Sequence, residues 1–473
     1  MTTETTTGKM PFREKFAYGF GDLASVLYWQ TFMAYILFFY TDIFGITAAA
    51  AGTMLLVTRL WDGVNDPMMG VVADRTETRW GRFRPYLLWL CVPFAVMGVL
   101  TFTTPDFSGS GKLVWAYVTF TLLMMLYTAI NIPYSALLGV VTANPVERAQ
   151  VSSIKFIFAY TAGMIVSFTL LPMAARLGGG NDQRGWQLSF IVYGIAAVAF
   201  FLIAFTFVRE RIKPVAKERT PIRQDLKDLL SNRPWVMLLL TTITMILFIA
   251  SRLTVTAHYF KYYVGEQEVS LFGYGGTYGF EYLASAFNGI GQIFSLIGVV
   301  FVGWFVKTLG QRRAFLTLYV VGIVACAAMY VCRPDQLALI FGLHLAFSFT
   351  TGPLSPLLWA MYADTADYGE WKYGRRATGL IFSASTMSQK FGWAIGSAFA
   401  GWLLFAVGFQ ANAEPTPEVQ HGLRLLVSVI PAVLGGVSIL LMLGYPLKED
   451  LVKQIGIELA ARREEAAETP EAR

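Results

Sequence analysis

Long apolar runs constrain the fold of this chain more than any other feature. A membrane-spanning helix needs about 20 mostly apolar residues, and about twelve stretches of the sequence meet that requirement. They lie near 16–41, 48–73, 86–103, 113–138, 150–174, 186–208, 234–260, 281–306, 313–332, 336–362, 378–408 and 419–446. Only 14% of the residues are charged, against about 25% in soluble domains. We therefore predict an all-α polytopic membrane protein with about twelve transmembrane helices.

Lysine and arginine residues concentrate in alternate loops between these runs. The loop from Arg75 to Arg84 is rich in them, whereas the loops around Asp42 and Glu414 are poor. Because basic loops remain in the cytoplasm, we predict a plasma (bacterial inner) membrane protein with both termini cytoplasmic. The net charge of +6 reflects this loop bias and does not indicate binding to nucleic acid. The polar N-terminus has no apolar core of a cleaved signal peptide.

A basic segment, Arg209–Arg233, divides the runs into two halves of six. We predict an N-terminal half at 1–208, a cytoplasmic linker at 209–233, a C-terminal half at 234–447 and a cytoplasmic tail at 448–473 that includes a short helix. Glycine followed by basic residues ends the second run of each half, in Gly70–Arg84 and Gly303–Arg313. Two halves that repeat in this way are typical of secondary transporters.

The loop after the second run carries charges beyond those that membrane orientation requires. We expect Asp74 to pair with an arginine across the gap between helices, and we count Arg84 among the structural charges of this loop. The alternative is that the arginines only set the orientation of the chain.

The second run contains three charged residues, Arg59, Asp62 and Asp66, which recur at helical spacing and so face the same way. A charge at the bilayer centre costs about 2.5–3.5 kcal/mol on insertion scales, so such residues usually have a function. Carboxylates suit a hard cation such as Na⁺, and Asn65 and Thr128 could add neutral oxygens. The same pair could instead hold a proton, because adjacent like charges raise one pKa. The structural alternative is an ion-pair network among Arg59, Asp62 and Asp66.

Four more polar residues approach the middle of predicted helices, at a rise of about 1.5 Å per residue. They are Asp22, Asn131, Lys155 and Lys390. We predict that they bind substrate, since substrate sites of such transporters lie near the midplane between the halves. The alternatives are a salt bridge between helices for Lys390 and snorkelling to the membrane surface for Lys155.

Aromatic and histidine residues carry weaker signals. Tyr127 and Trp359 could stack on a sugar ring, although aromatic residues in helices more often serve packing. His258 and His344 show no partner in the sequence, so we assign them no role.

Several motifs together resemble those of the glycoside–pentoside–hexuronide:cation symporters, the family of the melibiose permeases. The motifs are YGFGD (Tyr18–Asp22), FFYTDIFG (Phe38–Gly45), RLWDGVNDPMMG (Arg59–Gly70), RTETRWGRFRP (Arg75–Pro85), YTAINIPYSAL (Tyr127–Leu137), ADTADYGEWKYGRRATG (Ala363–Gly379) and the later STMSQK. The resemblance extends from Phe16 to Leu447 and implies a major facilitator fold that works by alternating access.

Carried over by position, the cation site of the family falls on Asp62, Asp66, Asn65 and Thr128, with Na⁺ as a possible ligand of the two aspartates. Arg59 matches an arginine of the family on the same helix. The resemblance also places Tyr127, Lys155, Trp359, Thr386 and Lys390 at the sugar site, with Lys155 in place of an arginine.

The sugar-binding carboxylates of the melibiose permeases are not present. The first falls on Val26, with Asp22 one turn lower, the second falls on Asn131, and a nearby tryptophan falls on Ser135. These differences argue against melibiose as the substrate. Within the family, asparagine at this position resembles members that take other glycosides, xylosides or glucuronides.

We therefore predict cation-coupled uptake of a sugar or glycoside, with Na⁺ or H⁺ as the coupling ion, no other cofactor, and a monomer as the functional unit. The alternative is transport of a non-sugar amphiphile such as a lysolipid or a drug. An enzyme is not expected, because the sequence contains no nucleophile–histidine–acid set, HExxH motif, P-loop or CxxC. The Gly- and Tyr-rich segment Val264–Phe280 is expected to be a flexible extracellular insert of unassigned role.

Overall fold

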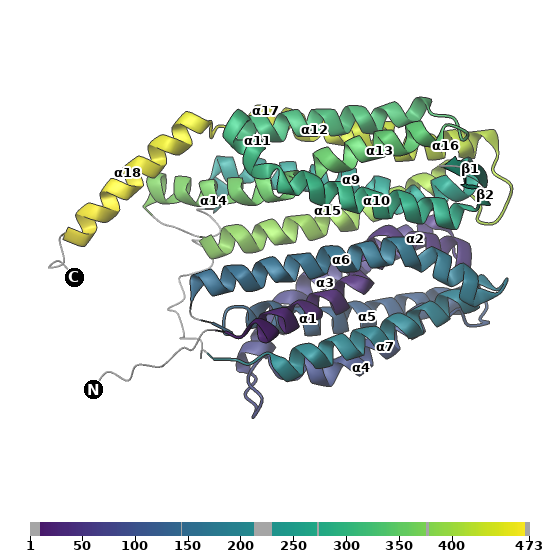
Figure 1. Ribbon diagram of the computed structural model, residues 1–473, viewed down its shortest axis with the longest axis horizontal. Helices are drawn as coiled ribbons and strands as arrows, with labels where there is room; N and C mark the ends of the chain where they lie inside the picture. The colour runs from purple at the N-terminus through teal and green to yellow at the C-terminus, as the bar shows by residue number, and fades with distance from the viewer. Residues whose placement is uncertain (1–9, 143, 212–228, 272–273, 375–377, 469–473) are drawn as a thin grey trace. The chain divides into compact units, whose positions relative to one another are not determined.

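The computed structural model describes residues 10–142, 144–211, 229–271, 274–374 and 378–468, and it is almost entirely helical (Figure 1). The first part contains α1 (Phe12–Ala34), α2 (Ile36–Phe38), the π-helix η1 (Phe39–Phe44), α3 (Ala48–Arg75), α4 (Arg84–Thr101), α5 (Gly109–Leu137), α6 (Pro145–Gly178) and α7 (Asp182–Phe207). The second contains α9 (Arg233–Tyr259), η2 (Phe260–Val264), β1 (Gln267–Leu271), β2 (Tyr274–Tyr278), α10 (Phe280–Val300), α11 (Val302–Leu309), α12 (Gln311–Ala328), η3 (Met329–Val331), α13 (Leu337–Thr351), α14 (Leu354–Tyr373), α15 (Thr378–Ala406), α16 (Pro417–Val427), α17 (Val429–Leu443) and α18 (Glu449–Glu468).

Among the described residues, nine helices are long and apolar enough to cross a membrane, or ten if the pair Phe12–Ala34 and Ile36–Phe44, bent by 63°, is one span. The predicted second and eleventh runs correspond to α3, of 28 residues, and α15, of 29 residues. Each is long enough to cross at about 1.5 Å per residue. Polar residues lower their hydropathy, so they fall outside the nine. The all-α polytopic prediction is confirmed.

The second predicted run forms a continuous helix despite its charges. Thr47 caps α3, because its hydroxyl oxygen accepts a hydrogen bond from the backbone N–H of Ala50 at 3.3 Å. Pro67 lies inside α3 and has no N–H to donate, so the carbonyl of Gly63 loses its helical partner. The helix therefore has a proline, and a carbonyl released from its helical hydrogen bond, close to Asp62 and Asp66.

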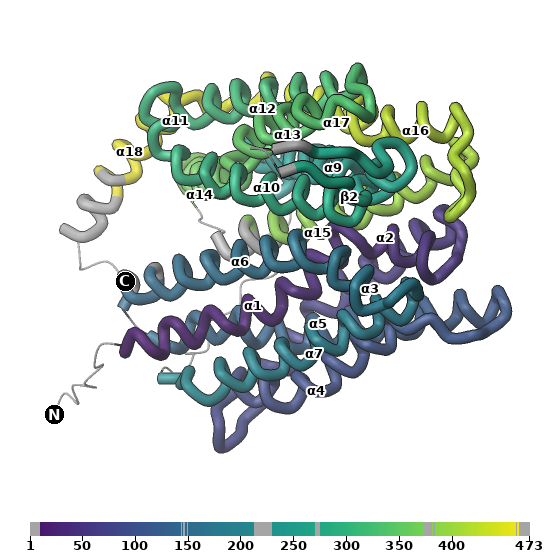
Figure 2. The backbone as a smooth tube through the Cα atoms, turned by 45° about the vertical axis from the view of Figure 1, so that its right-hand side comes forward, coloured from purple at the N-terminus to yellow at the C-terminus, as the bar shows by residue number. Residues whose placement is uncertain are grey.

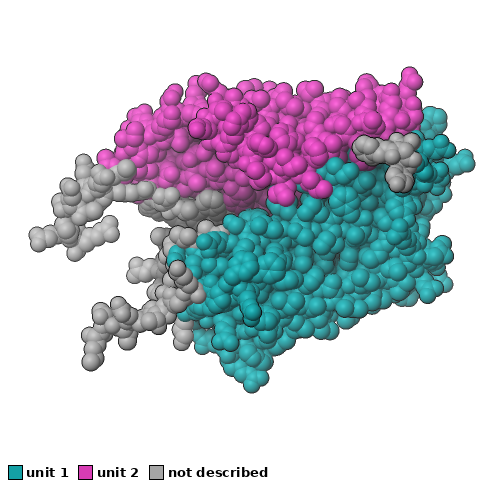
Figure 3. Space-filling view, viewed as in Figure 1, with its two compact units in different colours: residues 1–216, 253–292, 397–423 teal, residues 217–252, 293–396, 424–473 magenta. Residues whose placement is uncertain are grey.

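The chain divides into two compact units (Figure 3). Unit 1 comprises residues 1–216, 253–292 and 397–423, and unit 2 comprises 217–252, 293–396 and 424–473. Unit 1 thus contains all of the predicted N-terminal half together with two segments of the predicted C-terminal half. The division of the sequence at the linker stays a prediction, and residues 212–228 of that linker lie outside the described part.

In unit 1, α1 packs along α6, and the two helices lie side by side in Figures 1 and 2. α3 and α4 both pack against α5. Gly21 allows α1 to approach α5 closely, since a Cβ there would lie 2.4 Å from the ring of Tyr134. The phenol groups of Tyr18 and Tyr134 each donate to the backbone carbonyl of the other residue, at 2.9 and 2.7 Å.

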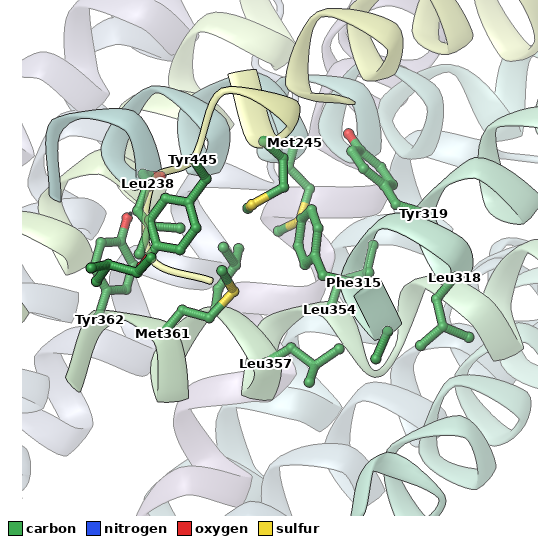
Figure 4. Packing of buried hydrophobic residues seen from close by; sticks show 14 of the residues in the cluster. Leu238, Met245, Phe315, Leu318, Tyr319, Leu354, Leu357, Met361, Tyr362 and Tyr445 are labelled. Carbon is green, nitrogen blue, oxygen red and sulfur yellow. Dashed lines mark hydrogen bonds between the residues drawn. The ribbon is translucent and has the colours of Figure 1, made fainter. Parts of the chain in front are cut away.

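The core of unit 2 is an apolar cluster contributed mainly by α9, α12, α14 and the residues around α17 (Figure 4). Tyr362 and Tyr445 lie in this cluster, near Met361. The hydroxyl of Tyr362 lies 2.7 Å from that of Thr242 on α9. These contacts fix α14 against α9.

Two peripheral segments have regular secondary structure. The segment Val264–Phe280, expected to be flexible, contains an antiparallel hairpin of β1 and β2 in which Gln267 faces Tyr278. The tail helix is confirmed as α18, and it packs on α14: the indole of Trp371 donates to Glu458 Oε2 at 2.5 Å. Residues 469–473, at the end of that tail, lie outside the described part.

Candidate functional site

Two carboxylates and one hydroxyl meet in unit 1. Asp62 and Asp66 project from successive turns of α3, and Thr128 faces them from α5. The Thr128 Oγ1 atom lies 2.5 Å from Asp62 Oδ1 and 3.0 Å from Asp66 Oδ1. A hydroxyl carries one proton, so it donates to one carboxylate at a time. The Asp62 side chain is buried and Asp66 is half-buried. The group offers closely spaced oxygens and excess negative charge, which suit a small cation or a proton.

Asn65 lies on the same helix, half-buried and next to Asp66. In the described part of the chain, no hydrogen bond joins the Asn65 side chain to Asp62 or to Asp66. The predicted cation site is therefore brought together at Asp62, Asp66 and Thr128, with Asn65 adjacent.

Arg59 lies one turn before Asp62, and its side chain is 4% exposed. Its guanidinium lies over the ring of Trp29, 5.1 Å from the ring centre, and Nη1 lies 3.8 Å from the sulfur of Met33. Its Nε and Nη2 atoms have no hydrogen-bond partner in the described part of the chain. Asp62 attracts the Arg59 guanidinium electrostatically, and the six ion pairs found within 4 Å in the described chain do not include Arg59.

Tyr127 connects this group to an aromatic surface. Its ring stacks on Trp29 with centroids 5.4 Å apart and planes 22° apart. Trp29 in turn lies under the Arg59 guanidinium, 5.1 Å from the ring centre. Tyr127 and Trp29 therefore present a stacked aromatic pair between the charges of α1 and those of α3.

A second charged pair lies between α1 and α6. Lys155 Nζ lies 3.7 Å from Asp22 Oδ1, and the ammonium is 5.6 Å from the centre of the Tyr134 ring. Lys155 therefore makes a contact between α6 and α1. Asn131 donates to the carbonyl of Tyr127 at 2.9 Å, one turn earlier on α5, which fixes the direction of its amide.

The other predicted substrate residues belong to unit 2. Trp359 lies on α14 and Thr386 and Lys390 lie on α15. Trp359 and Lys390 are half-buried, and Thr386 is exposed within the described chain. The Trp359 ring lies 6.1 Å from that of Tyr362.

The loop after α3 is organised by a residue that the sequence did not indicate. Asp74 is exposed and pairs with no described arginine, so the predicted pairing is not seen. The Glu210 carboxylate instead accepts hydrogen bonds from the backbone N–H groups of Arg82, Phe83 and Arg84, at 2.9, 2.7 and 3.0 Å. It thus caps the beginning of α4, where free N–H groups attract a negative charge.

Arg84 also has a structural role. Its Nη2 donates to the carbonyl of Phe205 at 2.6 Å, and its Nη1 donates to the carbonyl of Trp80 at 3.2 Å. Nearby, the guanidinium of Arg211 donates to Glu14, and this hydrogen bond raises the pKa of Arg211. These contacts tie the loop to the ends of α1 and α7.

A further cluster of unit 1, here called the Asp42 cluster, comprises Thr41, Asp42, His258, Lys261, Tyr262 and Asn412. The Asp42 carboxylate is fully buried. Lys261 Nζ lies 2.8 Å from its Oδ1, and the phenol of Tyr262 donates to the same oxygen. Its Oδ2 lies 2.7 Å from the Thr41 hydroxyl and 3.4 Å from His258 Nε2.

Asn412 completes the cluster from the loop after α15. Its amide donates to the carbonyl of Asp42 at 2.8 Å and accepts from Lys261 at 2.6 Å. Asn412 has a φ of 59°, a left-handed conformation that asparagine tolerates better than most residues. The cluster therefore joins the end of the first predicted span to the end of α9 and to this loop.

His258 and His344, to which the sequence analysis assigned no role, both have partners in the structure. His258 belongs to the Asp42 cluster, and in unit 2 Arg252 Nη2 donates to His344 Nδ1 at 3.2 Å. The sequence holds no local signal for either contact. In the Asp42 cluster, the motif FFYTDIFG was the available hint, because it places an acid at the end of an apolar run.

Comparison with known proteins agrees with this architecture. Residues 17–449 match the family described as MFS/sugar transport protein. The isoprimeverose transporter of Lactiplantibacillus pentosus is 36% identical over 440 residues, covering 92% of this chain and 89% of the relative. A protein of Escherichia coli (strain K12) whose name proposes glycoside/cation symport is 35% identical over 457 residues and covers 96% of each chain.

Among solved structures, a D-xylose-proton symporter superposes with a TM-score of 0.65 and 15% sequence identity, covering 92% of this chain and 98% of that one. At that identity the likeness shows the fold, which is that of the major facilitator transporters. The chain is therefore a multi-pass membrane transporter and not an enzyme, and it belongs to the glycoside–pentoside–hexuronide:cation symporters of the major facilitator superfamily.

Proposed function

We propose that this protein couples the entry of one cation to the uptake of a sugar or glycoside, and that the cation binds at Asp62, Asp66 and Thr128. The observation that carries the proposal is the single Thr128 hydroxyl between the two carboxylates, at 2.5 and 3.0 Å. Two carboxylates this close repel each other, and a cation or a proton relieves that repulsion. A membrane potential of 100 mV supplies about 2.3 kcal/mol per charge, enough for roughly fifty-fold accumulation.

The substrate binds, in this proposal, to the stacked Trp29–Tyr127 surface and to polar groups around it. In unit 1 these groups are Asp22, Asn131 and Lys155. In unit 2, Trp359, Thr386 and Lys390 stay predicted substrate residues. The apolar faces of a sugar ring fit aromatic rings, and its hydroxyl groups fit amide and ammonium groups. The buried Nε and Nη2 groups of Arg59, next to Trp29, are available as donors to the substrate or to a state of the site without cation.

Transport proceeds by alternating access in a monomer whose termini are both cytoplasmic. The Asp42 cluster joins spans from the two halves of the sequence. In this proposal the cluster breaks when the cycle opens the transporter on the membrane side where Asp42 lies. Asp74 and Arg84 take no part in binding in this proposal. They are structural charges of the loop after α3, which Glu210 and Arg84 hold by hydrogen bonds.

The decisive experiment uses purified protein in proteoliposomes and a panel of labelled β-xylosides, other glycosides and glucuronides. A Na⁺ gradient at constant pH and a pH gradient without Na⁺ are imposed separately. We expect one gradient to drive accumulation of at least one glycoside. Asp62→Asn and Asp66→Asn should lose this gradient dependence, whereas Asp106→Asn, a change at an exposed aspartate, should retain it.

Two results would contradict the proposal. Unchanged cation dependence in both aspartate variants would place the coupling ion elsewhere. Binding of lysolipids without binding of any glycoside would favour the amphiphile alternative.

A further inference from the structure

Unit 2 contains a cavity of about 510 Å³ that the proposed transport cycle does not use. It lies where three spans end: α12 begins at Gln311, the α13–α14 span ends at Lys372, and the α16–α17 span ends at Leu443. Residues of α11, α14 and the start of α18 line it. The cavity is therefore at the level of the membrane where lipid headgroups lie.

Charges of both signs line this cavity. Four are cationic: Lys307, Arg312, Arg313 and Lys453. Three are anionic: Asp364, Glu449 and Asp450. None of these seven side chains forms an ion pair within 4 Å with another charged group of the described chain, and the ion pairs of that part lie elsewhere. Seven charges around one cavity without such a pair favour an ionic ligand that contacts both signs.

Buried polar atoms at the cavity also lack partners. The Tyr445 hydroxyl, Arg312 Nε and Glu449 Oε1 make no hydrogen bond with any described residue. Tyr445 is 3% exposed, and it lies near Met361, which also lines the cavity (Figure 4). Leaving a buried polar group without a partner costs about 1–3 kcal/mol, so such groups usually meet a ligand or water.

The charges are arranged by depth. Lys307, Arg313 and Lys453 are exposed at the rim, whereas Asp364 and Tyr445 lie further in. Asp364 is on α14, eight residues before the end of the span at Lys372. A ligand with an ammonium group next to Asp364 and a phosphate group nearer the rim, among the cations there, would match this order of charges.

An apolar path leads away from the cavity along α11. Val306 and Leu309 line the cavity, and Trp304 on the same helix is 60% exposed. Val300 and Phe301, just before α11, are 75% and 46% exposed. These side chains offer a surface for acyl chains next to a charged cavity, which is the amphiphilic pattern of a lipid.

We propose that this cavity binds the headgroup of a phospholipid with a primary ammonium, as in phosphatidylethanolamine. The ammonium contacts Asp364 and the Tyr445 hydroxyl, and the phosphate contacts Arg312, Arg313, Lys307 and Lys453. Phosphatidylcholine has no N–H donor for the inner end, and phosphatidylglycerol has no positive charge there. The site uses neither Asp62 nor Asp66, so its test is independent of the transport proposal.

The test measures lipid binding by native mass spectrometry on detergent-purified full-length protein. Phosphatidylethanolamine, phosphatidylglycerol, phosphatidylcholine and inorganic phosphate are added separately at matched concentrations. We expect phosphatidylethanolamine to bind at least five-fold more tightly than phosphatidylcholine or phosphatidylglycerol. The double variant Lys307→Gln/Lys453→Gln should weaken its binding about ten-fold, and Lys448→Gln, an exposed lysine of the same segment outside the cavity, should not.

Tyr445→Phe provides a second measurement. Without lipid, this change removes a buried hydroxyl that has no partner, so the melting temperature should stay the same or rise. With phosphatidylethanolamine, the variant should lose part of the stabilisation that the wild type gains. Equal binding of all three phospholipids would overturn the proposal, as would a loss of binding in Lys448→Gln. Full competition by inorganic phosphate would assign the cavity to a soluble phosphate ligand instead.

Discussion

Unit 1 contains two groups of carboxylates inside membrane-spanning helices, and they are built in opposite ways. At Asp42, one carboxylate meets an ammonium, a phenol, a hydroxyl and an imidazole. At Asp62 and Asp66, two carboxylates converge on one hydroxyl. The first arrangement satisfies its charge from within the protein, as a structural contact does. The second concentrates negative charge around a shared donor, which is the arrangement that a mobile cation would complete. The contrast distinguishes the structural contact at Asp42 from the proposed cation site more clearly than the presence of buried acids does.

The largest expected effect is on stability, and it tests directly whether the carboxylates at Asp42 and at Asp66 differ in role. Asp42→Ala removes the partner of Lys261, Tyr262 and Thr41, and it should lower the free energy of unfolding by about 3–5 kcal/mol, the cost of breaking a buried ion pair. Asp66→Asn, measured without coupling cation, should be neutral or stabilising because it removes repulsion between like charges. Denaturation in detergent measures both, with Asp106→Ala as the exposed control. Equal losses at Asp42 and Asp66 would show that both groups are structural.

Ligand protection is the next largest effect. Saturation with the coupling cation at about 100 times its dissociation constant should stabilise the wild type by about 2.7 kcal/mol. Asp66→Asn should lose this protection. Tyr262→Phe, which changes only the Asp42 cluster, should start from a lower melting temperature but gain the same increment. Cation protection that survives in Asp66→Asn would contradict the assignment.

A smaller effect tests the shared hydroxyl. Thr128→Val keeps the shape of the side chain but removes the oxygen between the carboxylates. We expect about ten-fold weaker cation binding, equivalent to about 1.4 kcal/mol, and recovery in Thr128→Ser. Thr119→Val is the matched control on the same helix, because the Thr119 hydroxyl bonds only within α5. Isothermal titration with Na⁺, and pH titration of sugar binding, measure the affinity.

The smallest effect concerns Glu458 on α18, a half-buried carboxylate near the surface. The Trp371 indole, helped by Gln454, lowers the pKa of Glu458 and so favours the docked α18. A lowered pKa means that the contact is fully present above the usual glutamate pKa and is lost as the pH falls through the lowered value. Hydrogen exchange of α18 should therefore differ between wild type and Glu458→Gln at neutral pH and converge in acid. A difference that persists unchanged in acid would contradict this linkage.

Sequence alone sufficed for features that depend on periodicity and local charge. The apolar runs predicted the spans, and the spacing of Asp62 and Asp66 predicted that they share a face. Thr128 was placed opposite them by resemblance, and the structure brings its hydroxyl to both. These features follow from one helix or from a motif of a few residues.

Contacts between distant segments could not be predicted in the same way. Thr41 and His258 are 217 positions apart, and neither lies in a pattern that specifies the other. Glu210 was read as part of a basic linker, because nothing in the sequence shows that three N–H groups face it. Asp74 was expected to form an ion pair, but a charge at the end of a helix can remain in water at little cost.

The capping contact of Glu210 has a practical consequence for the design of split transporters. Residues 209–211 are attached at three places: Arg209 N–H and the Arg211 guanidinium to Glu14, Glu210 to the start of α4, and Arg211 N–H to the carbonyl of Val140 at 2.8 Å. A fragment that stops at the end of α7, at Phe207, would discard all of them. The break between co-expressed halves, a fluorescent-protein insertion or a protease site should therefore be placed after Arg211. The N-terminal piece then keeps the hydrogen bonds of residues 209–211.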